Sequence, residues 1–153
     1  LSFTISNVAQ YEITGYLQNL KFQKIDSDSI KSLTDKPVLI QTATYLKSVS
    51  DKTKKQIMVY TMVDVDTNKD GKLDTSDIKA LYLSEISGEK FTKISLDFQE
   101  LIDWNLIEST NRLYFRTVED TNKNGQFDTK DVVNYNYIDL SKKEWKVIEY
   151  KPV

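Results

Sequence analysis

Two twelve-residue windows of the sequence carry oxygen-bearing side chains at the same positions. They read DTNKDGKLDTSD at 66–77 and DTNKNGQFDTKD at 120–131, and they agree at eight of the twelve positions. A loop of this length binds Ca²⁺ through oxygens at its positions 1, 3, 5, 7, 9 and 12. Positions 1, 3, 5, 9 and 12 are Asp or Asn in both windows, so the spacing predicts two calcium sites.

The candidate ligands follow from these positions, where position 7 contributes its backbone carbonyl and position 9 commonly binds through a water molecule. In the first window they are Asp66, Asn68, Asp70, the carbonyl of Lys72, Asp74 and Asp77. In the second window they are Asp120, Asn122, Asn124, the carbonyl of Gln126, Asp128 and Asp131. We expect the second site to be weaker, because an amide at its position 5 replaces a carboxylate.

Positions 6 and 8 of the windows also suit a calcium loop. Position 6 needs a sharp turn with positive φ, and it holds Gly71 and Gly125, two of only four glycines in the chain. Position 8 holds the apolar side chains of Leu73 and Phe127. The competing interpretation is a pair of metal-free turns, because Asp, Asn and Gly favour turns in any case. Carboxylates crowded into one loop repel one another without a cation, which favours the calcium interpretation.

The windows differ from a calcium-sensing EF-hand in two respects. Position 12 is Asp77 or Asp131, one methylene shorter than the usual bidentate Glu. The flanking segments have the pattern of strands, whereas a sensor opens a pair of helices to expose a Met-rich groove. The chain has only two methionines, Met58 and Met62. The sequence therefore indicates calcium clips between strands rather than a sensor.

The strands that would position these loops form a repeat. Alternating and β-branched patterns predict strands at 38–46, 56–64, 80–86 and 89–95, and again at 101–107, 112–119, 133–140 and 144–150. LYLSEISGEKFTKIS (81–95) aligns without a gap over YNYIDLSKKEWKVIE (135–149), and a partial third copy lies at 21–35, with Ile25, Ile30 and Leu33 in core positions.

These patterns predict one all-β domain over 1–153, with internal repeats at about 21–35 (partial), 38–95 and 101–150. Each fuller repeat is a four-stranded antiparallel meander of the kind that forms propeller blades, with a calcium loop between strands. A β-sandwich or a barrel is the alternative. No long helix is predicted, and the polar stretch at 48–55 is expected to be a hairpin turn.

Composition excludes several functions. The chain has no Cys and no His, which removes thiolate and imidazole chemistry and the usual zinc sites. The net charge is −2 and no long basic run occurs, which argues against nucleic-acid binding. No apolar run approaches the length of a membrane span. No acidic pair outside the loops stands out as catalytic, so we expect a protein that is not an enzyme.

Two resemblances rest on these residues. Each window resembles a dockerin loop, which also ends in Asp, although dockerins place helices where this chain has strands. The segments 61–95 and 116–149, about half the chain, resemble bacterial envelope proteins whose propeller-like blades carry calcium loops, in the style of TolB-type and integrin-type blades. The resemblance implies an extracytoplasmic, often lipid-anchored module without a reaction of its own. It also implies that Asp74 and Asp128 bind calcium directly, whereas the residues alone leave a bridging water open.

The function predicted is therefore a calcium-binding extracytoplasmic structural or interaction module. Extracellular calcium loops are weak enough to suit millimolar calcium outside the cell. The alternative is calcium-assisted binding of a carbohydrate or another ligand, since the chain has nine Tyr and two Trp, although Trp104 and Trp145 are expected in the core. The partner, a protein or a glycan, is not identified. An unfinished repeat leaves open edges that favour a homodimer. The start at Leu1, without Met, suggests a removed upstream segment that could carry a lipid anchor, and 1–20 give no firm prediction.

Overall fold

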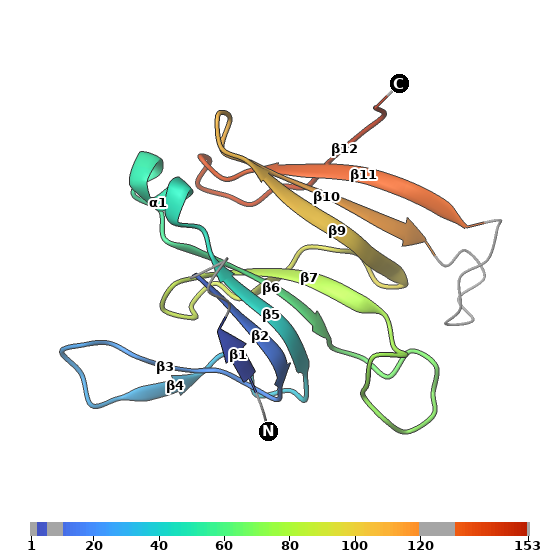
Figure 1. The fold of residues 1–153 in the computed structure, drawn as a ribbon, viewed down its shortest axis with the longest axis horizontal. Coiled ribbons are helices and arrows are strands. Elements are labelled where there is room, and N and C mark those ends of the chain that lie inside the picture. Colours follow the sequence, from blue (N-terminus) through green and yellow to red (C-terminus); the bar gives the residue numbers. More distant parts are fainter. Residues whose placement is uncertain (1–2, 6–10, 120–130, 153) are drawn as a thin grey trace.

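Antiparallel strands dominate the part of the chain that this computed structural model describes, residues 3–5, 11–119 and 131–152 (Figure 1). The elements are β1 (Phe3–Ile5), β2 (Glu12–Leu17), β3 (Lys21–Gln23), β4 (Ile30–Ser32), β5 (Leu39–Tyr45), α1 (Lys47–Thr53), β6 (Ile57–Val63), β7 (Lys79–Glu85), β8 (Thr92–Lys93), β9 (Gln99–Ile107), β10 (Arg112–Glu119), β11 (Val132–Asp139) and β12 (Ile148–Tyr150). The all-β prediction is confirmed. Among these described elements, no helix is long and apolar enough to cross a membrane.

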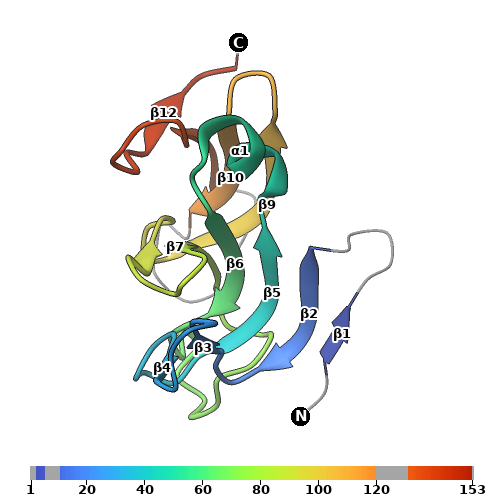
Figure 2. The same ribbon diagram turned by 90° about the vertical axis from the view of Figure 1, so that its left-hand side faces the viewer.

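The described strands form three sheets. Six strands pair in the order β1-β2-β5-β6-β7-β8, four in the order β12-β11-β10-β9, and β3 with β4 makes a separate hairpin. Figure 2 shows β1, β2, β5 and β6 side by side in that order. Both larger sheets have two open edges in the described part of the chain, so neither closes as a barrel.

β6 lies at the centre of the fold because both of its faces are buried. One face carries Ile57 and Val59, which pack in a cluster with Leu81 of β7 and with Leu113 and Ile138 of the four-stranded sheet. The opposite face belongs to a second cluster, formed with strands β2 and β5 and with the β3-β4 hairpin. All seven residues of β6 are buried, as expected for a strand covered on both sides.

Six of the eight predicted strands of the two fuller repeats appear within about two residues of their predicted ends, a usual uncertainty for such boundaries. The other two are shorter than expected: only 92–93 of the segment 89–95 and only 148–150 of the segment 144–150 are strands. The sequence segment 48–55, expected as a turn, instead contains most of α1. Val49 of that helix is fully buried, and a 2.6 Å ion pair joins Lys47 to Asp51 on its exposed side. The helix ends at Thr53 and is capped by the left-handed residue Lys54, whose φ is 63°.

The predicted partial repeat at 21–35 coincides with the β3-β4 hairpin, but two of its predicted core residues are exposed. Ile25 and Ile30 face solvent, whereas Leu33 is buried in the second cluster. Phe22 and Leu33 join the second core cluster, whereas Ile25 and Ile30 belong to neither cluster. Phe22 lies under Gly88 of the β7-β8 turn, where a Cβ would come within 2.8 Å of its ring.

We expect Leu81→Ala to reduce the free energy of unfolding by about 2–5 kcal/mol, because the leucine is fully buried between two sheets. The matched control is Leu96→Ala, whose side chain is 67% exposed, with an expected effect within about 0.5 kcal/mol. Urea denaturation at neutral pH measures both. Equal losses in the two variants would contradict this description of the core.

Candidate calcium loops

The first window forms the connection between β6 and β7. These two strands pair along their whole length up to the partners Val63 and Lys79, so the window leaves and re-enters one ladder. The chain reverses through two left-handed residues, Lys69 with φ 61° and Gly71 with φ 82°. The space around Gly71 is open, so glycine is favoured there by backbone conformation rather than by crowding. The sharp turn predicted at position 6 is confirmed for this window.

The side-chain oxygens at positions 1, 3 and 5 accept hydrogen bonds from amides of the same loop. Asp66 accepts from the amides of Asp70, at 3.2 Å, and Gly71, at 2.8 Å. Asn68 accepts from Asp70 at 3.1 Å through its Oδ1, and Asp70 accepts from the amide of Lys72 at 2.9 Å. These side chains therefore turn back on the loop backbone in this structure.

Asp77, the last residue of the window, is its buried anchor. Its side chain is among the buried charged groups, with 3% of the residue exposed. One carboxylate oxygen accepts from the amides of Thr67, at 3.0 Å, and Asn68, at 3.3 Å, and the other accepts from the amide of Asp74 at 3.0 Å. A single carboxylate thus joins the beginning of the loop to its end.

Asp74 is hydrogen-bonded to its close neighbour Ser76. Its carboxylate accepts from the hydroxyl and the amide of Ser76, and these bonds hold the pKa of Asp74 below its usual value. Within the described residues, no group of three or more Asp, Glu, His or Cys side chains is arranged to hold a metal ion. The loop therefore has the oxygen donors and the turn that calcium needs, and calcium coordination stays a prediction.

The second window lies almost entirely outside the described residues, and so do its predicted ligands Asp120, Asn122, Asn124, Gln126 and Asp128. Asp131 is described and is half-buried immediately before β11. The strands on either side of the window pair with each other, Glu119 opposite Val132. The second window, like the first, therefore connects two neighbouring antiparallel strands.

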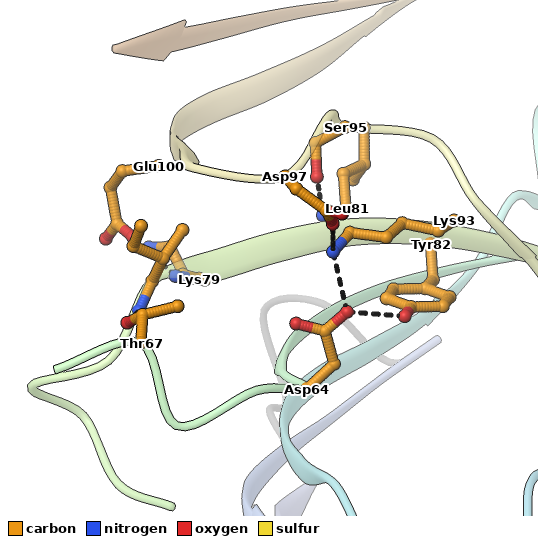
Figure 3. Close-up of polar contacts among 10 residues, drawn as sticks. Asp64, Thr67, Lys79, Leu81, Tyr82, Lys93, Ser95, Asp97 and Glu100 are labelled. Atoms are coloured by element: carbon orange, nitrogen blue, oxygen red, sulfur yellow. Dashed lines mark hydrogen bonds and ion pairs between the residues drawn. The ribbon is translucent and has the colours of Figure 1, made fainter. Parts of the chain in front are cut away.

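A polar network that the sequence analysis did not predict stands at the base of the first loop (Figure 3). Asp64, which follows β6, accepts a 2.6 Å hydrogen bond from the hydroxyl of Tyr82 and forms a 2.8 Å ion pair with Lys93. Lys93 also pairs with Asp97 at 2.6 Å. Burial opposes the charge of Lys93, but the two carboxylates outweigh burial and raise its pKa. Burial and the bond to Asp64 raise the pKa of Tyr82, so its hydroxyl stays protonated.

Glu100 connects the base of the first loop to the four-stranded sheet. Its carboxylate accepts a hydrogen bond from the amide of Lys79, the first residue of β7. Glu100 itself pairs with Val118 in β10, and its neighbour Gln99 pairs with Glu119, which directly precedes the second window. The bases of the two windows are therefore joined through the beginning of β9.

Two groups of aromatic residues bear on function, one packed on the core and one on a sheet surface. Trp104 and Trp145 are half-buried and pack against the first cluster, as predicted. Four tyrosines gather on the opposite surface of the four-stranded sheet, with neighbouring ring centroids 5.4–6.0 Å apart: Tyr114, Tyr135, Tyr137 and Tyr150. The guanidinium of Arg112 lies 4.5 Å from the ring centre of Tyr137. The alternation in NYNY (134–137) was the available sequence signal for this group.

No family model, no curated protein and no solved structure matches this chain.

Glu100 provides a pH test of the link between loop and sheet. Burial raises the pKa of this carboxyl above its ordinary value, with the bond from Lys79 opposing the shift. A raised folded-state pKa favours the protonated fold, so this contribution is present below the unfolded pKa and is lost as pH rises through the folded pKa. We expect Glu100→Gln, which keeps an acceptor for Lys79, to be more stable than wild type at pH 7, with the difference vanishing in acid.

Chemical denaturation at neutral and at acid pH measures this difference. The exposed carboxylate Glu144, changed to Gln, is the matched control and should leave the difference near zero at both pH values. A Glu100→Gln variant that is less stable than wild type at neutral pH would refute the assignment of burial as the dominant effect.

Proposed function

We propose that this protein is a calcium-binding structural or interaction module in which the windows 66–77 and 120–131 clip adjacent β-strands. The observation that carries the proposal is the loop between β6 and β7. It has oxygen donors at every position that calcium requires, a left-handed Gly71, and a terminal carboxylate, Asp77, that bonds to amides at the beginning of the loop. No helix flanks the loop in the described residues, which supports a clip over a sensor.

Calcium would act on this loop by neutralising the carboxylates that the window contains. Asp66, Asp70, Asp74 and Asp77 supply four negative charges within one window, and loop amides compensate them only in part. A cation that binds the folded loop and not the unfolded chain stabilises the fold by about 2.7 kcal/mol when free calcium is 100 times its dissociation constant. The stabilised element is the end of β6, the strand with two buried faces.

The strand ends that flank the two windows lie at one end of the molecule. Figure 1 shows the β6-β7 loop and the described ends of β10 and β11 on the same side. Glu100 and Gln99 join the two bases through β9. We therefore propose that both clips stabilise one common edge, the first more strongly than the second, because Asn124 weakens the second donor set.

The strand order supports a repeat of blade-like units. β5 to β8 and β9 to β12 are each four antiparallel strands in sequence order, and each set has its window between its second and third strands. We propose that these are two related meanders of the kind found in propeller blades, packed face to face through the first cluster. An extracytoplasmic location, where calcium is millimolar, suits such weak sites and belongs to the same proposal.

Calorimetric titration of calcium tests the clips directly. We expect two binding events in wild type, loss of the stronger one in Asp66→Ala, and loss of the weaker one in Asp120→Ala. The exposed Asp26, which lies outside both windows, serves as the control in Asp26→Ala and should leave both events unchanged. Absence of binding heat at millimolar calcium, together with a melting temperature that excess chelator does not lower, would refute the proposal.

Carbohydrate binding is a second candidate function, and the tyrosine group on the four-stranded sheet favours it. Tyrosine rings with an adjacent cation offer apolar faces and hydroxyls together, a combination enriched at binding surfaces. Tyr114 and Tyr137 lie opposite each other on neighbouring strands, with Tyr150 touching both rings. These side chains come from three strands and form one continuous surface.

A glycan array probed with and without calcium tests this second function. We expect Tyr137→Ala to reduce any glycan signal, because it removes the ring under Arg112 and beside Tyr150. Tyr16→Ala, at a tyrosine that is 58% exposed on β2, is the matched control and should keep the signal. A blank array, or equal loss in both variants, would eliminate carbohydrate binding at this surface.

A further inference from the structure

A basic groove lies at the opposite end of β6 and β7 from the first calcium loop. Its volume is about 570 Å³, and its walls are the segment 54–57 after α1, the β7-β8 turn at 85–90 and the turn at 142–145 after β11. The groove contacts the first residue of β6 and the last of β7, whereas the loop joins their other ends. Five lining residues are lysines and one is acidic, in a chain whose net charge is −2.

Two of these lysines fix the walls of the groove. Lys55 donates a 2.8 Å hydrogen bond to the carbonyl of Ser141, and Lys90 donates one of 2.8 Å to the carbonyl of Lys143. The ammonium of Lys90 also lies 4.3 Å from the ring centre of Trp145. These contacts attach the turn after β11 to the six-stranded sheet, so the groove is formed in advance of any ligand.

The other three lysines form no ion pair in the described part of the chain, although Lys142 interacts electrostatically with Asp139. Lys54, Lys142 and Lys143 are exposed, and in the described part of the chain their ammonium groups have no hydrogen bond or ion pair. Glu85, the single acidic residue of the lining, pairs with none of them. Like charges brought together from distant segments repel one another, and an anion in the groove would relieve that repulsion.

We propose that this groove binds an acidic sugar residue, one that carries a carboxylate or a sulfate. Lys54, Lys142 and Lys143 would neutralise the anionic group, while Ile86 and the half-buried Trp145 offer apolar surface to the C–H face of the ring. A bare inorganic anion leaves that apolar surface in water. A concave site fits a single sugar residue better than it fits a flat membrane surface. A long nucleic acid would need a longer basic surface than this groove offers.

This site is independent of the calcium clips and of the tyrosine group, because it shares no residue with either. Evidence against the calcium clips would therefore not count against sugar binding in the groove, and evidence against the groove would not count against the clips.

Fluorescence of Trp145 tests the groove. The full chain with Trp104→Phe has Trp145 as its only tryptophan. We expect saturable, salt-sensitive changes with trigalacturonate or with a sulfated heparin disaccharide, and none with a neutral galactotriose. Pyrophosphate and ATP form the comparison arms. Calorimetry on the unaltered chain provides a readout that does not depend on the tryptophan substitution.

The role of the three exposed lysines is tested in a triple variant that carries Lys54→Gln, Lys142→Gln and Lys143→Gln. Exposed ion pairs contribute about two- to five-fold each, so we expect binding to weaken roughly ten-fold or more. The matched control is Lys21→Gln with Lys36→Gln and Lys151→Gln, exposed lysines outside the groove that lower the net charge equally. Absence of acidic-sugar binding, equal loss in the two triple variants, or tighter binding of pyrophosphate or ATP would each overturn the proposal.

Discussion

The burial of β6 on both faces is the constraint on which the rest of the structure depends. Ile57 and Val59 face the four-stranded sheet, and Met58, Tyr60 and Met62 face the β3-β4 hairpin and the outer strands. If this strand shifted by one residue, the side chains of its two faces would exchange places between the two core clusters. Packing on both faces therefore fixes the register of β6, and with it the position of both strand ends. The window 66–77 follows one end, and the basic groove lies at the other.

Charges of opposite sign collect at the two ends of β6 and β7. At the loop, carboxylates accept hydrogen bonds from backbone amides, and the buried Asp77 joins the beginning of the loop to its end in this way. At the groove, two ammonium groups donate hydrogen bonds to backbone carbonyls, and one of them also lies over the ring of Trp145. Backbone dipoles compensate each set in part. We infer that ligands complete the compensation, a cation at one end and an anion at the other, without altering the strand ladder between them.

Features that depend on local residue patterns, such as strands and the glycine turn, could be predicted from the sequence. Features that depend on contacts between distant segments could not. Runs such as QIMVYTMV are β-branched and apolar enough to place β6 closely, and the glycine at position 6 of the first window predicted the left-handed turn at Gly71. Helix α1 was missed because its residues are mostly polar and its only buried one, Val49, is selected by tertiary packing. The Asp64–Lys93 pair and the groove join segments about 30 to 90 residues apart, beyond any periodicity.

The most direct test of the calcium clip is hydrogen exchange measured residue by residue by NMR, with calcium titrated from none to millimolar. The account predicts slower exchange, saturating with calcium, at the loop amides of Gly71 and Lys72 and at the paired strand ends near Val63 and Glu119. It also predicts that amides in the β3-β4 hairpin, a separate sheet that lies on the other side of Figure 1 from the β6-β7 loop, keep their rates. Exchange at Gly71 and Lys72 that is unchanged at millimolar calcium would contradict the central claim.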